Sequence, residues 1–236
     1  MKKILLFAGA ALAAGVLSSQ AQAVYSQNIV GYVNTTLPGG NAYSLISVPL
    51  GGASAVDAAM PSIQGGDNVL VWNGAGYDAL TYVGPDFDGA GHAWADGDFN
   101  GQPSPVITPG QAFYYQNSGT LAITNTFVGN VVLTNSITIP GGNAYTLLAS
   151  TAPVADALDG TNLALPFQSG DTVLIWTGSG YSALTYVGPD FDGAGHAFAD
   201  ADFVGQPSPV IEVGQGFFYQ NSGSSAITWN QNFNVQ

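Results

Sequence analysis

The sequence of 236 residues contains no cysteine and only two lysine or arginine residues, Lys2 and Lys3. Without cysteine the chain forms no disulfide, carries no lipid on an amino-terminal cysteine and performs no thiol catalysis. Nucleic acids and anionic membranes are bound through clusters of Lys and Arg, so neither is an expected partner. The 15 acidic residues therefore have almost no basic side chains to pair with, and divalent cations are the expected counter-charge.

A secretory signal peptide is predicted over residues 1–23. Lys2 and Lys3 precede an apolar run at 4–17, and the small-residue triplet at 21–23 fits a cleavage site. Cleavage removes both basic residues, which moves the formal net charge from −13 to −15. No later segment approaches the roughly 20 consecutive apolar residues of a spanning helix. We therefore expect a secreted protein without a membrane span, extracellular or on the cell surface, with the periplasm as the alternative.

The rest of the sequence is a tandem repeat. VLVWNGAGYDALTYVGPDFDGAGHA from Val69 returns from Val173 as VLIWTGSGYSALTYVGPDFDGAGHA, and PGGNAYSL from Pro38 returns from Pro140 as PGGNAYTL. Since 46% of the residues are hydrophobic and 11% are aromatic, each repeat can bury a core. The sequence predicts two repeats of about 100 residues, an ordinary domain size, at 24–125 and 126–236.

The local pattern predicts β-strands. Short runs rich in Val, Ile, Leu, Thr, Tyr and Phe alternate with Gly, Asn, Ser and Pro, which is typical of strands and turns. Residues 69–83 predict one hairpin, and residues 111–128 predict a second. The helical candidate is 55–60, with Ser54 as its N-cap and Pro61 ending it. We therefore predict an all-β protein of two tandem β-sandwich or barrel-like repeats.

Three motifs occur in succession: YSLIS at 43–47, WNGAGY at 72–77 and PGQAFYY at 109–115. The second repeat carries related motifs at 145–149, 176–181 and 213–219, with Val213 in place of Pro109. This succession resembles a module of uncharacterised secreted bacterial all-β repeat proteins. The resemblance covers nearly the whole chain after the signal peptide. It implies a cell-surface or extracellular module, and it implies no catalytic residue.

Acidic segments are the most unusual feature of both repeats. GPDFDGAGHAWADGDF begins at Gly84 and returns from Gly188 as GPDFDGAGHAFADADF. Ca²⁺ takes about six to eight oxygen ligands from flexible loops, so calcium is the predicted cofactor. Unlike the Asp-x-Asp-x-Asp-Gly pattern of an EF-hand loop, Asp86 and Asp88 are followed directly by Gly89 in place of a third Asp, and no Glu closes the loop. A solvated turn closed by Asp side chains is the alternative. The candidate metal ligands are Asp86, Asp88, Asp96, Asp98, Asp190, Asp192, Asp200 and Asp202.

His92 and His196 lie at equivalent positions within the acidic segments. A histidine among aspartates would serve as a transition-metal ligand or a general base. Structural zinc sites usually combine several Cys or His residues, and each repeat has one His. We expect each imidazole to pack beside Trp94 or Phe198 and to hydrogen-bond a neighbouring carboxylate.

Aromatic residues give a second functional option. They would stack on sugar rings, although aromatic residues also occur on the buried faces of strands. The candidates are Trp72, Tyr77, Trp94, Trp176 and Tyr181. The sequence predicts an exported, non-catalytic structural or adhesive protein, ordered by calcium, with a carbohydrate-binding module as the alternative and a metal-dependent hydrolase as the third possibility. Polysaccharide or further copies of the chain are the expected macromolecular partners.

Overall fold

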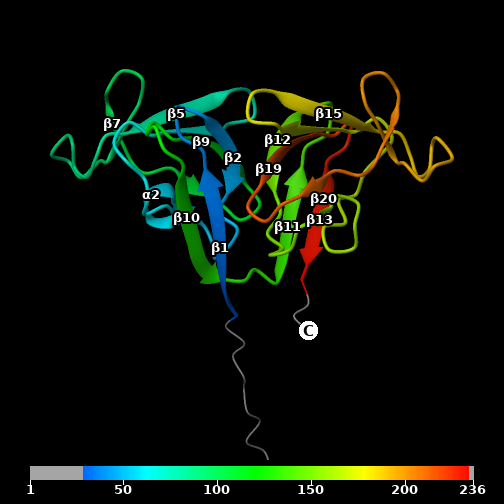
Figure 1. Cartoon of the computed structure of the whole chain (residues 1–236), viewed down its shortest axis with the longest axis horizontal. Helices are drawn as coiled ribbons and strands as arrows, with labels where there is room; N and C mark the ends of the chain where they lie inside the picture. Colours follow the sequence, from blue (N-terminus) through cyan, green and yellow to red (C-terminus); the bar gives the residue numbers. More distant parts are fainter. Residues whose placement is uncertain (1–28, 234–236) are drawn as a thin grey trace, which may run out of the picture.

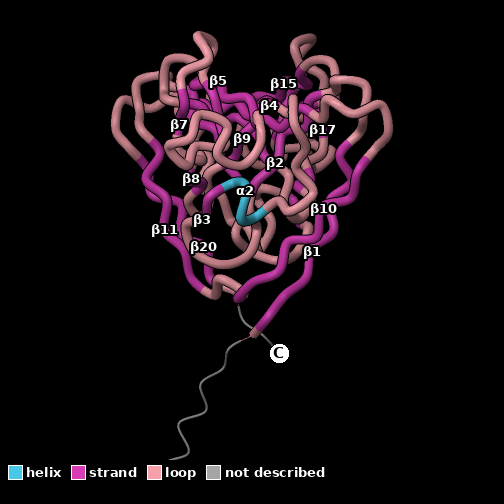
Figure 2. The backbone as a smooth tube through the Cα atoms, turned by 90° about the vertical axis from the view of Figure 1, so that its left-hand side faces the viewer, coloured by secondary structure: helices cyan, strands magenta, loops and turns pink. Residues whose placement is uncertain are grey.

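The computed structural model describes residues 29–233, so the predicted signal peptide lies outside the described residues. The described chain is almost entirely β-structure, which confirms the all-β prediction, and its one helix is α2 (Val56–Ala59). No helix within 29–233 has the length and apolar character needed to cross a membrane. Figure 1 shows the two repeats side by side along the longest axis, and Figure 2 shows both described ends of the chain at the same end of the molecule.

The first repeat is a six-stranded antiparallel sheet in the order β2-β9-β4-β5-β6-β7, together with two two-stranded pairs, β1–β10 and β3–β8. Its strands are β1 (Val30–Leu37), β2 (Tyr43–Ser47), β3 (Ser54–Ala55), β4 (Asn68–Trp72), β5 (Tyr77–Tyr82), β6 (Trp94–Ala95), β7 (Gly101–Gln102), β8 (Val106–Ile107), β9 (Ala112–Gln116) and β10 (Ile123–Asn130).

The second repeat has the same topology, with sheet order β12-β19-β14-β15-β16-β17 and the pairs β11–β20 and β13–β18. Its strands are β11 (Thr134–Ile139), β12 (Tyr145–Ala149), β13 (Asp156–Ala157), β14 (Thr172–Trp176), β15 (Tyr181–Tyr186), β16 (Phe198–Ala199), β17 (Gly205–Gln206), β18 (Val210–Ile211), β19 (Gly216–Gln220) and β20 (Ile227–Asn232). The two sequence repeats therefore also share the same strand order.

Strand β10 crosses the division that we predicted between residues 125 and 126. It pairs with β1 from Leu37↔Ile123 to Val30↔Asn130, so both of its halves belong to the first repeat. The joining strand is thus not shared between the repeats, and the second repeat starts with β11, which pairs with β20. The strand pairing groups residues 30–130 and 134–232.

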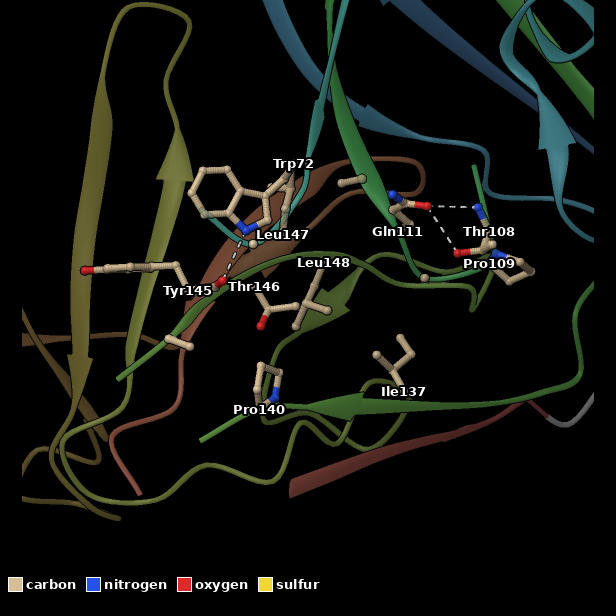
Figure 3. A pocket seen from close by; sticks show the side chains of 14 residues that line it. Trp72, Thr108, Pro109, Gln111, Ile137, Pro140, Tyr145, Thr146, Leu147 and Leu148 are labelled. Atoms are coloured by element: carbon tan, nitrogen blue, oxygen red, sulfur yellow. Dashed lines mark hydrogen bonds between the residues drawn. The ribbon is translucent and has the colours of Figure 1, made fainter. Parts of the chain in front are cut away.

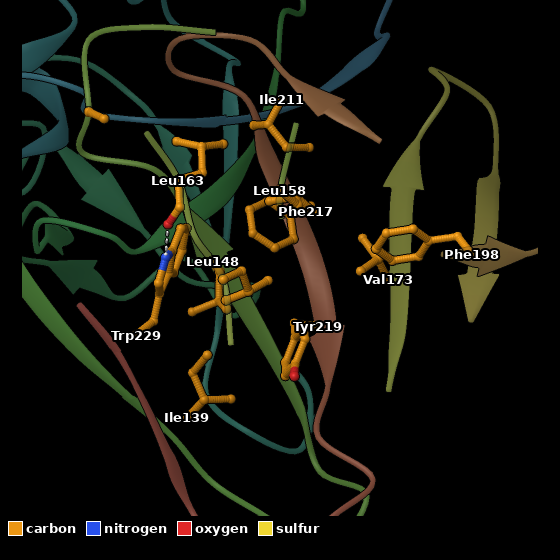
Figure 4. Close-up of a cluster of buried hydrophobic side chains, with 12 residues drawn as sticks. Ile139, Leu148, Leu158, Leu163, Val173, Phe198, Ile211, Phe217, Tyr219 and Trp229 are labelled. Carbon is orange, nitrogen blue, oxygen red and sulfur yellow. Dashed lines mark hydrogen bonds between the residues drawn. The ribbon is translucent and has the colours of Figure 1, made fainter. Parts of the chain in front are cut away.

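Each two-stranded ribbon packs one face against the sheet of its own repeat. Burial alternates along β1 and β11, as expected for strands with one buried face. In the second repeat Ile139 and Trp229 come from the ribbon, and they join Leu148, Phe217 and Tyr219 from the sheet in one core (Figure 4). A sheet facing a ribbon across a hydrophobic core is a small sandwich.

The first predicted hairpin is confirmed, and the second is wrong. Strands β4 and β5 pair through Trp72↔Tyr77. In contrast, β9 pairs with β2 and β4, whereas β10 pairs with β1. The Asn117 side chain explains the difference, because it accepts a hydrogen bond from Gly119 N–H (2.9 Å) and donates to the carbonyls of Leu37 (3.2 Å) and Leu121 (3.0 Å). These bonds direct the chain from the sheet into the ribbon.

The short helix also differs from the prediction. Its N-cap is Ala55, with no side-chain capping bond, because Ser54 lies in β3 and its hydroxyl donates to the Ala55 carbonyl. The first-turn residue Asp57 accepts a hydrogen bond from the hydroxyl of Ser104 (2.7 Å). The helix is thus held by the strand pair β3–β8 and its neighbouring loop rather than by its own cap.

Candidate functional site

The two sheets meet through an aromatic interface, which comprises Tyr43, Trp72, Tyr77 and Tyr114 of the first repeat and Tyr145, Trp176, Tyr181 and Phe218 of the second. The Trp72 ring lies edge-on to Phe218 with centroids 5.4 Å apart, and Trp176 lies in the same way against Tyr114 at 5.4 Å. Edge-to-face pairs of this kind add about 0.5–1.5 kcal/mol each beyond burial.

Hydrogen bonds cross the aromatic interface in both directions. The indole N–H of Trp72 donates to the carbonyl of Tyr145 (3.2 Å), and that of Trp176 donates to the carbonyl of Tyr43 (2.9 Å). The backbone continues this pattern, because Ser47 N–H donates to the Gly214 carbonyl and Ala149 N–H to the Gly110 carbonyl, both at 2.9 Å. Equivalent contacts in each direction give the interface approximate two-fold symmetry.

Tyrosine hydroxyls also form a hydrogen bond across the aromatic interface. The Tyr114 hydroxyl hydrogen-bonds that of Tyr181, and the Tyr77 ring packs against Tyr114 with centroids 5.7 Å apart. Burial, followed by the neighbouring hydroxyl of Tyr181, raises the pKa of both Tyr77 and Tyr114. These phenols therefore stay neutral at physiological pH, and they act as hydrogen-bonding groups rather than as bases.

The aromatic residues that we proposed for ligand stacking have other partners in this structure. Trp72, Tyr77, Trp176 and Tyr181 belong to the aromatic interface, where the residues Tyr77 and Tyr181 remain 39% and 42% exposed. Trp94 is completely buried in the core of the first repeat, beside Tyr82. Trp94 is therefore corrected from a stacking candidate to a core residue, because neither face of its ring reaches solvent.

A groove of about 430 Å³ runs along the aromatic interface, between the edge strand β12 and the turn before β9 (Figure 3). Trp72, Ile137, Pro140 and Leu148 supply its apolar surface, and the Gln111 side chain is held by the N–H and hydroxyl of Thr108, both at 3.2 Å. The residues lining it include no carboxylate, imidazole or amine. The groove thus suits neutral molecules.

The acidic segments form loops at opposite ends of the molecule (Figure 1). In the first loop, Asp86 accepts a hydrogen bond from the N–H of Gly91 (2.5 Å), and Asp88 accepts one from the N–H of Ala90 (2.9 Å). The second loop repeats both bonds, from Gly195 to Asp190 (2.5 Å) and from Ala194 to Asp192 (2.9 Å). The carboxylates are therefore turned toward their own backbone.

His92 pairs with Asp88 in the first loop, with 2.6 Å between Nδ1 and the carboxylate, and His196 pairs with Asp192 at the same distance. This confirms the expected hydrogen bond to a neighbouring carboxylate. The imidazole is the main cause that lowers the pKa of Asp88, and the N–H of Ala90 adds to it. A side chain at Gly101 would place its Cβ 1.9 Å from the Asp88 carboxylate, so β7 approaches the pair closely because this residue is glycine.

The second half of each acidic segment is a tight turn. Asp96 accepts hydrogen bonds from the N–H groups of Asp98 (3.0 Å) and Asn100 (2.9 Å), and from the side chain of Gln102 (2.9 Å). The bond from Asn100 N–H is the main cause that lowers the pKa of Asp96. Asp200 forms the equivalent turn in the second repeat, with bonds from Asp202 and Val204.

The eight candidate metal ligands are thus dispersed rather than gathered. Within residues 29–233, no three His, Asp or Glu side chains are grouped as a metal ion would require. The structure brings together Asp88 with His92 in the first repeat and Asp192 with His196 in the second. Asp86, Asp96, Asp190 and Asp200 bond to separate backbone groups, and the carboxylates of Asp98 and Asp202 accept none of the hydrogen bonds found within 29–233. Calcium binding stays a prediction from sequence, and the hydrogen bonds of the loops favour the alternative, a turn closed by Asp side chains.

The lowered pKa values predict how stability responds to acid. The pKa of Asp88, Asp96, Asp192 and Asp200 lies below the ordinary value of 3.8 in the folded protein, so the stability they add is present above pH 3.8 and is lost as the pH falls through the lower folded value. Urea titrations should give a constant midpoint between about pH 7 and pH 5 and a falling midpoint below about pH 4.

A variant with Asp88→Asn and Asp192→Asn is the control for this pH prediction, because it removes two of the four groups without disturbing the turns at Asp96 and Asp200. Its midpoint should decline less steeply below about pH 4. An equally steep decline would show that other carboxylates cause the acid sensitivity.

Sequence reasoning missed two buried carboxylates, Asp67 and Asp171, which have no exposed surface. Asp171 accepts hydrogen bonds from Gln168 N–H (2.7 Å), from Ser222 N–H (2.8 Å) and hydroxyl (2.9 Å), and from the Tyr219 hydroxyl. Burial, followed by the carboxylate, raises the pKa of Tyr219. The available signal was the pattern D-x-V-L-x-W, with an Asp two residues before the VL pair in both repeats.

Comparisons with models of known protein families, with curated proteins and with solved structures found no match to this chain. The resemblance to secreted all-β repeat modules therefore stays a prediction, and the proposals below rest on the geometry of the chain itself.

Proposed function

We propose that the chain is an exported, non-catalytic structural or adhesive protein that presents two like acidic loops from one rigid body. The observation that supports this proposal is the aromatic interface. It joins the repeats through indole hydrogen bonds at 3.2 Å and 2.9 Å, so the loops are held at fixed positions at opposite ends. A body with two equivalent, outward-facing loops is suited to bridging two partners.

The proposed role is tested in the cells that produce the protein. Fractionation should find the protein in the medium or at the cell surface, and deletion of its coding sequence should weaken cell-to-cell cohesion or matrix integrity. Purified protein should hydrolyse no ester or glycoside in a turnover screen. Confinement to the cytoplasm, or turnover that survives purification, would overturn the proposal.

Calcium dependence is tested on the purified mature chain by thermal unfolding in EDTA, in Ca²⁺ and in Mg²⁺. Because the loop carboxylates already accept backbone hydrogen bonds, both ions should raise the unfolding temperature by the same small amount, through screening alone. A ligand at 100 times its dissociation constant adds about 2.7 kcal/mol. A large rise selective for Ca²⁺ would instead establish the predicted site.

A variant with Asp86, Asp88, Asp190 and Asp192 changed to Asn is the control for calcium. If ions act by screening, wild type and variant should respond alike. A rise that wild type shows and the variant lacks would assign the ion to the loops and would contradict the alternative of turns closed by Asp side chains.

Carbohydrate binding is the second candidate, and the uncharged groove beside Trp72 favours it. Sugars stack on aromatic faces and need few charged groups. A soluble polysaccharide that binds there should change the fluorescence of Trp72, and Trp72→Phe should remove that change while Trp176 remains. Fluorescence that stays constant across a polysaccharide panel would rule against this candidate.

A further inference from the structure

Phe99 and Phe203 are exposed aromatic residues in the tight turns that end the two acidic segments, with 72% and 74% of their surface accessible. Neither belongs to a hydrophobic core cluster of the described chain. Burying a Phe side chain is worth about 1.5–3 kcal/mol, so each ring forgoes a favourable contribution to folding. Folding therefore gives no reason for a phenyl ring at either position.

The backbone makes the two phenylalanines still more unusual. Phe99 has φ 62° and Phe203 has φ 60°, in the left-handed region that favours Gly, Asn and Asp. Such conformations cost about 1–3 kcal/mol for other residues, and they concentrate at sites of recognition. Glycine or asparagine would fit this turn better, so the phenyl ring is present at a cost to stability.

Two backbone hydrogen bonds close the turn that carries each ring. Phe99 N–H donates to the Asp96 carbonyl (3.0 Å) and Asp96 N–H donates to the Asn100 carbonyl (3.1 Å). Phe203 and Asp200 form the same bonds at 3.0 Å and 3.1 Å. The next residue differs between the repeats, Asn100 in one and Val204 in the other, whereas the phenyl ring is the same.

We propose that Phe99 and Phe203, each with the carboxylate that precedes it, form two equivalent docking tips for a basic segment of another protein. This inference rests on the proposed adhesive role and names the class of partner. Lysine and arginine bind to an aromatic face through cation–π contacts and to a carboxylate through charge-assisted hydrogen bonds. Asp98 and Asp202 supply the carboxylates.

Charge selects this partner over a second copy of the chain. The described residues contain no lysine or arginine, and each loop carries four aspartates within thirteen residues. Two loops of this kind would repel each other, whereas a segment rich in Lys or Arg supplies the missing charge. Because the tips lie at opposite ends of one body, one molecule would bridge two basic segments.

Binding of a poly-L-arginine peptide to the purified mature protein tests the proposal. The test variant carries Phe99→Asn and Phe203→Asn, which keep the charge and suit the left-handed backbone. The matched control carries Val106→Asn and Val210→Asn, two exposed apolar residues outside the loops. Wild type and control should bind two peptides per chain, and the Phe variant should bind at least about fivefold more weakly.

The unfolding temperature separates docking from a structural role. The Phe variant should unfold at the same temperature as wild type or at a higher one, because asparagine tolerates the left-handed conformation. A lower unfolding temperature would make the rings structural and would overturn the proposal. Equal peptide binding by the Phe variant and the control, or no binding by wild type, would overturn it as well.

A complementation experiment distinguishes this proposal from the broader one. In cells that lack the protein, the Phe variant should fail to restore cohesion while the valine control restores it. A Phe variant that restores cohesion fully would overturn the docking tips and leave the structural role intact. If deletion has no effect on cohesion, the adhesive role is wrong, and the docking tips then have no role in cohesion either.

Discussion

Replacing Asp171 with Ala should lower the free energy of unfolding by about 4 kcal/mol, because the change leaves two N–H groups and two hydroxyls without their acceptor inside the protein. Each unsatisfied buried donor costs about 1–3 kcal/mol, and part of that cost is recovered where water enters. Asp67→Ala should have an effect of the same size, since Asp67 makes the equivalent bonds to Gln64, Tyr115 and Ser118. Urea denaturation measures both.

Asp202→Ala is the control for the buried carboxylates. This residue is exposed, and its carboxylate accepts none of the hydrogen bonds found within 29–233, so its loss should change the free energy of unfolding by less than about 0.5 kcal/mol. A similar small loss for Asp171→Ala would show that the buried hydrogen bonds do not hold the sheet as described.

Gly216→Ala should destabilise the protein by about 2 kcal/mol through the aromatic interface. The added methyl group would lie 2.5 Å from the Cβ of Ala112 and 3.0 Å from the Leu45 side chain, closer than carbon atoms approach. Overpacking of this kind typically costs about 1–3 kcal/mol. Gly180→Ala provides the comparison, because no atom lies within 4 Å of the position that its methyl group would take.

The approximate two-fold symmetry suggests a second substitution that should restore the stability lost in Gly216→Ala. Ala112 and Gly216 occupy the same position in β9 and β19, so Ala112→Gly combined with Gly216→Ala exchanges the two residues. The double variant should recover most of the lost free energy of unfolding. If the exchange leaves the protein as unstable as Gly216→Ala alone, the two residues do not face each other across the interface.

Local sequence patterns were sufficient for the strands and failed for their long-range pairing. The turn 73–76 predicted the pairing of β4 with β5, because the partners are adjacent in the chain. The pairing of β1 with β10 joins residues about 90 positions apart, and no local pattern specifies it. The bonds of Asn117, which separate β9 from β10, likewise depend on Leu37 in a distant strand.

The candidate site shows the same limit. Side chains alternate between the two faces of a sheet, but the sequence of one repeat does not reveal that the other repeat covers one of these faces. Four consecutive residues of β9 are buried because both faces of this strand are covered. Trp72 and Trp176 were therefore expected to face a ligand, and they lie against the opposite repeat. The exposed ring of Phe99 was missed because nothing in its sequence predicts a left-handed backbone for phenylalanine.

Scanning calorimetry of the purified mature chain tests most directly whether the aromatic interface makes the two repeats one body. One cooperative unit should give a single transition in which the calorimetric enthalpy equals the van't Hoff enthalpy. Two independent repeats of about 100 residues would give a calorimetric enthalpy about twice the van't Hoff value, or two separate transitions. Equality supports a rigid body with two fixed loops, and the twofold ratio would contradict it.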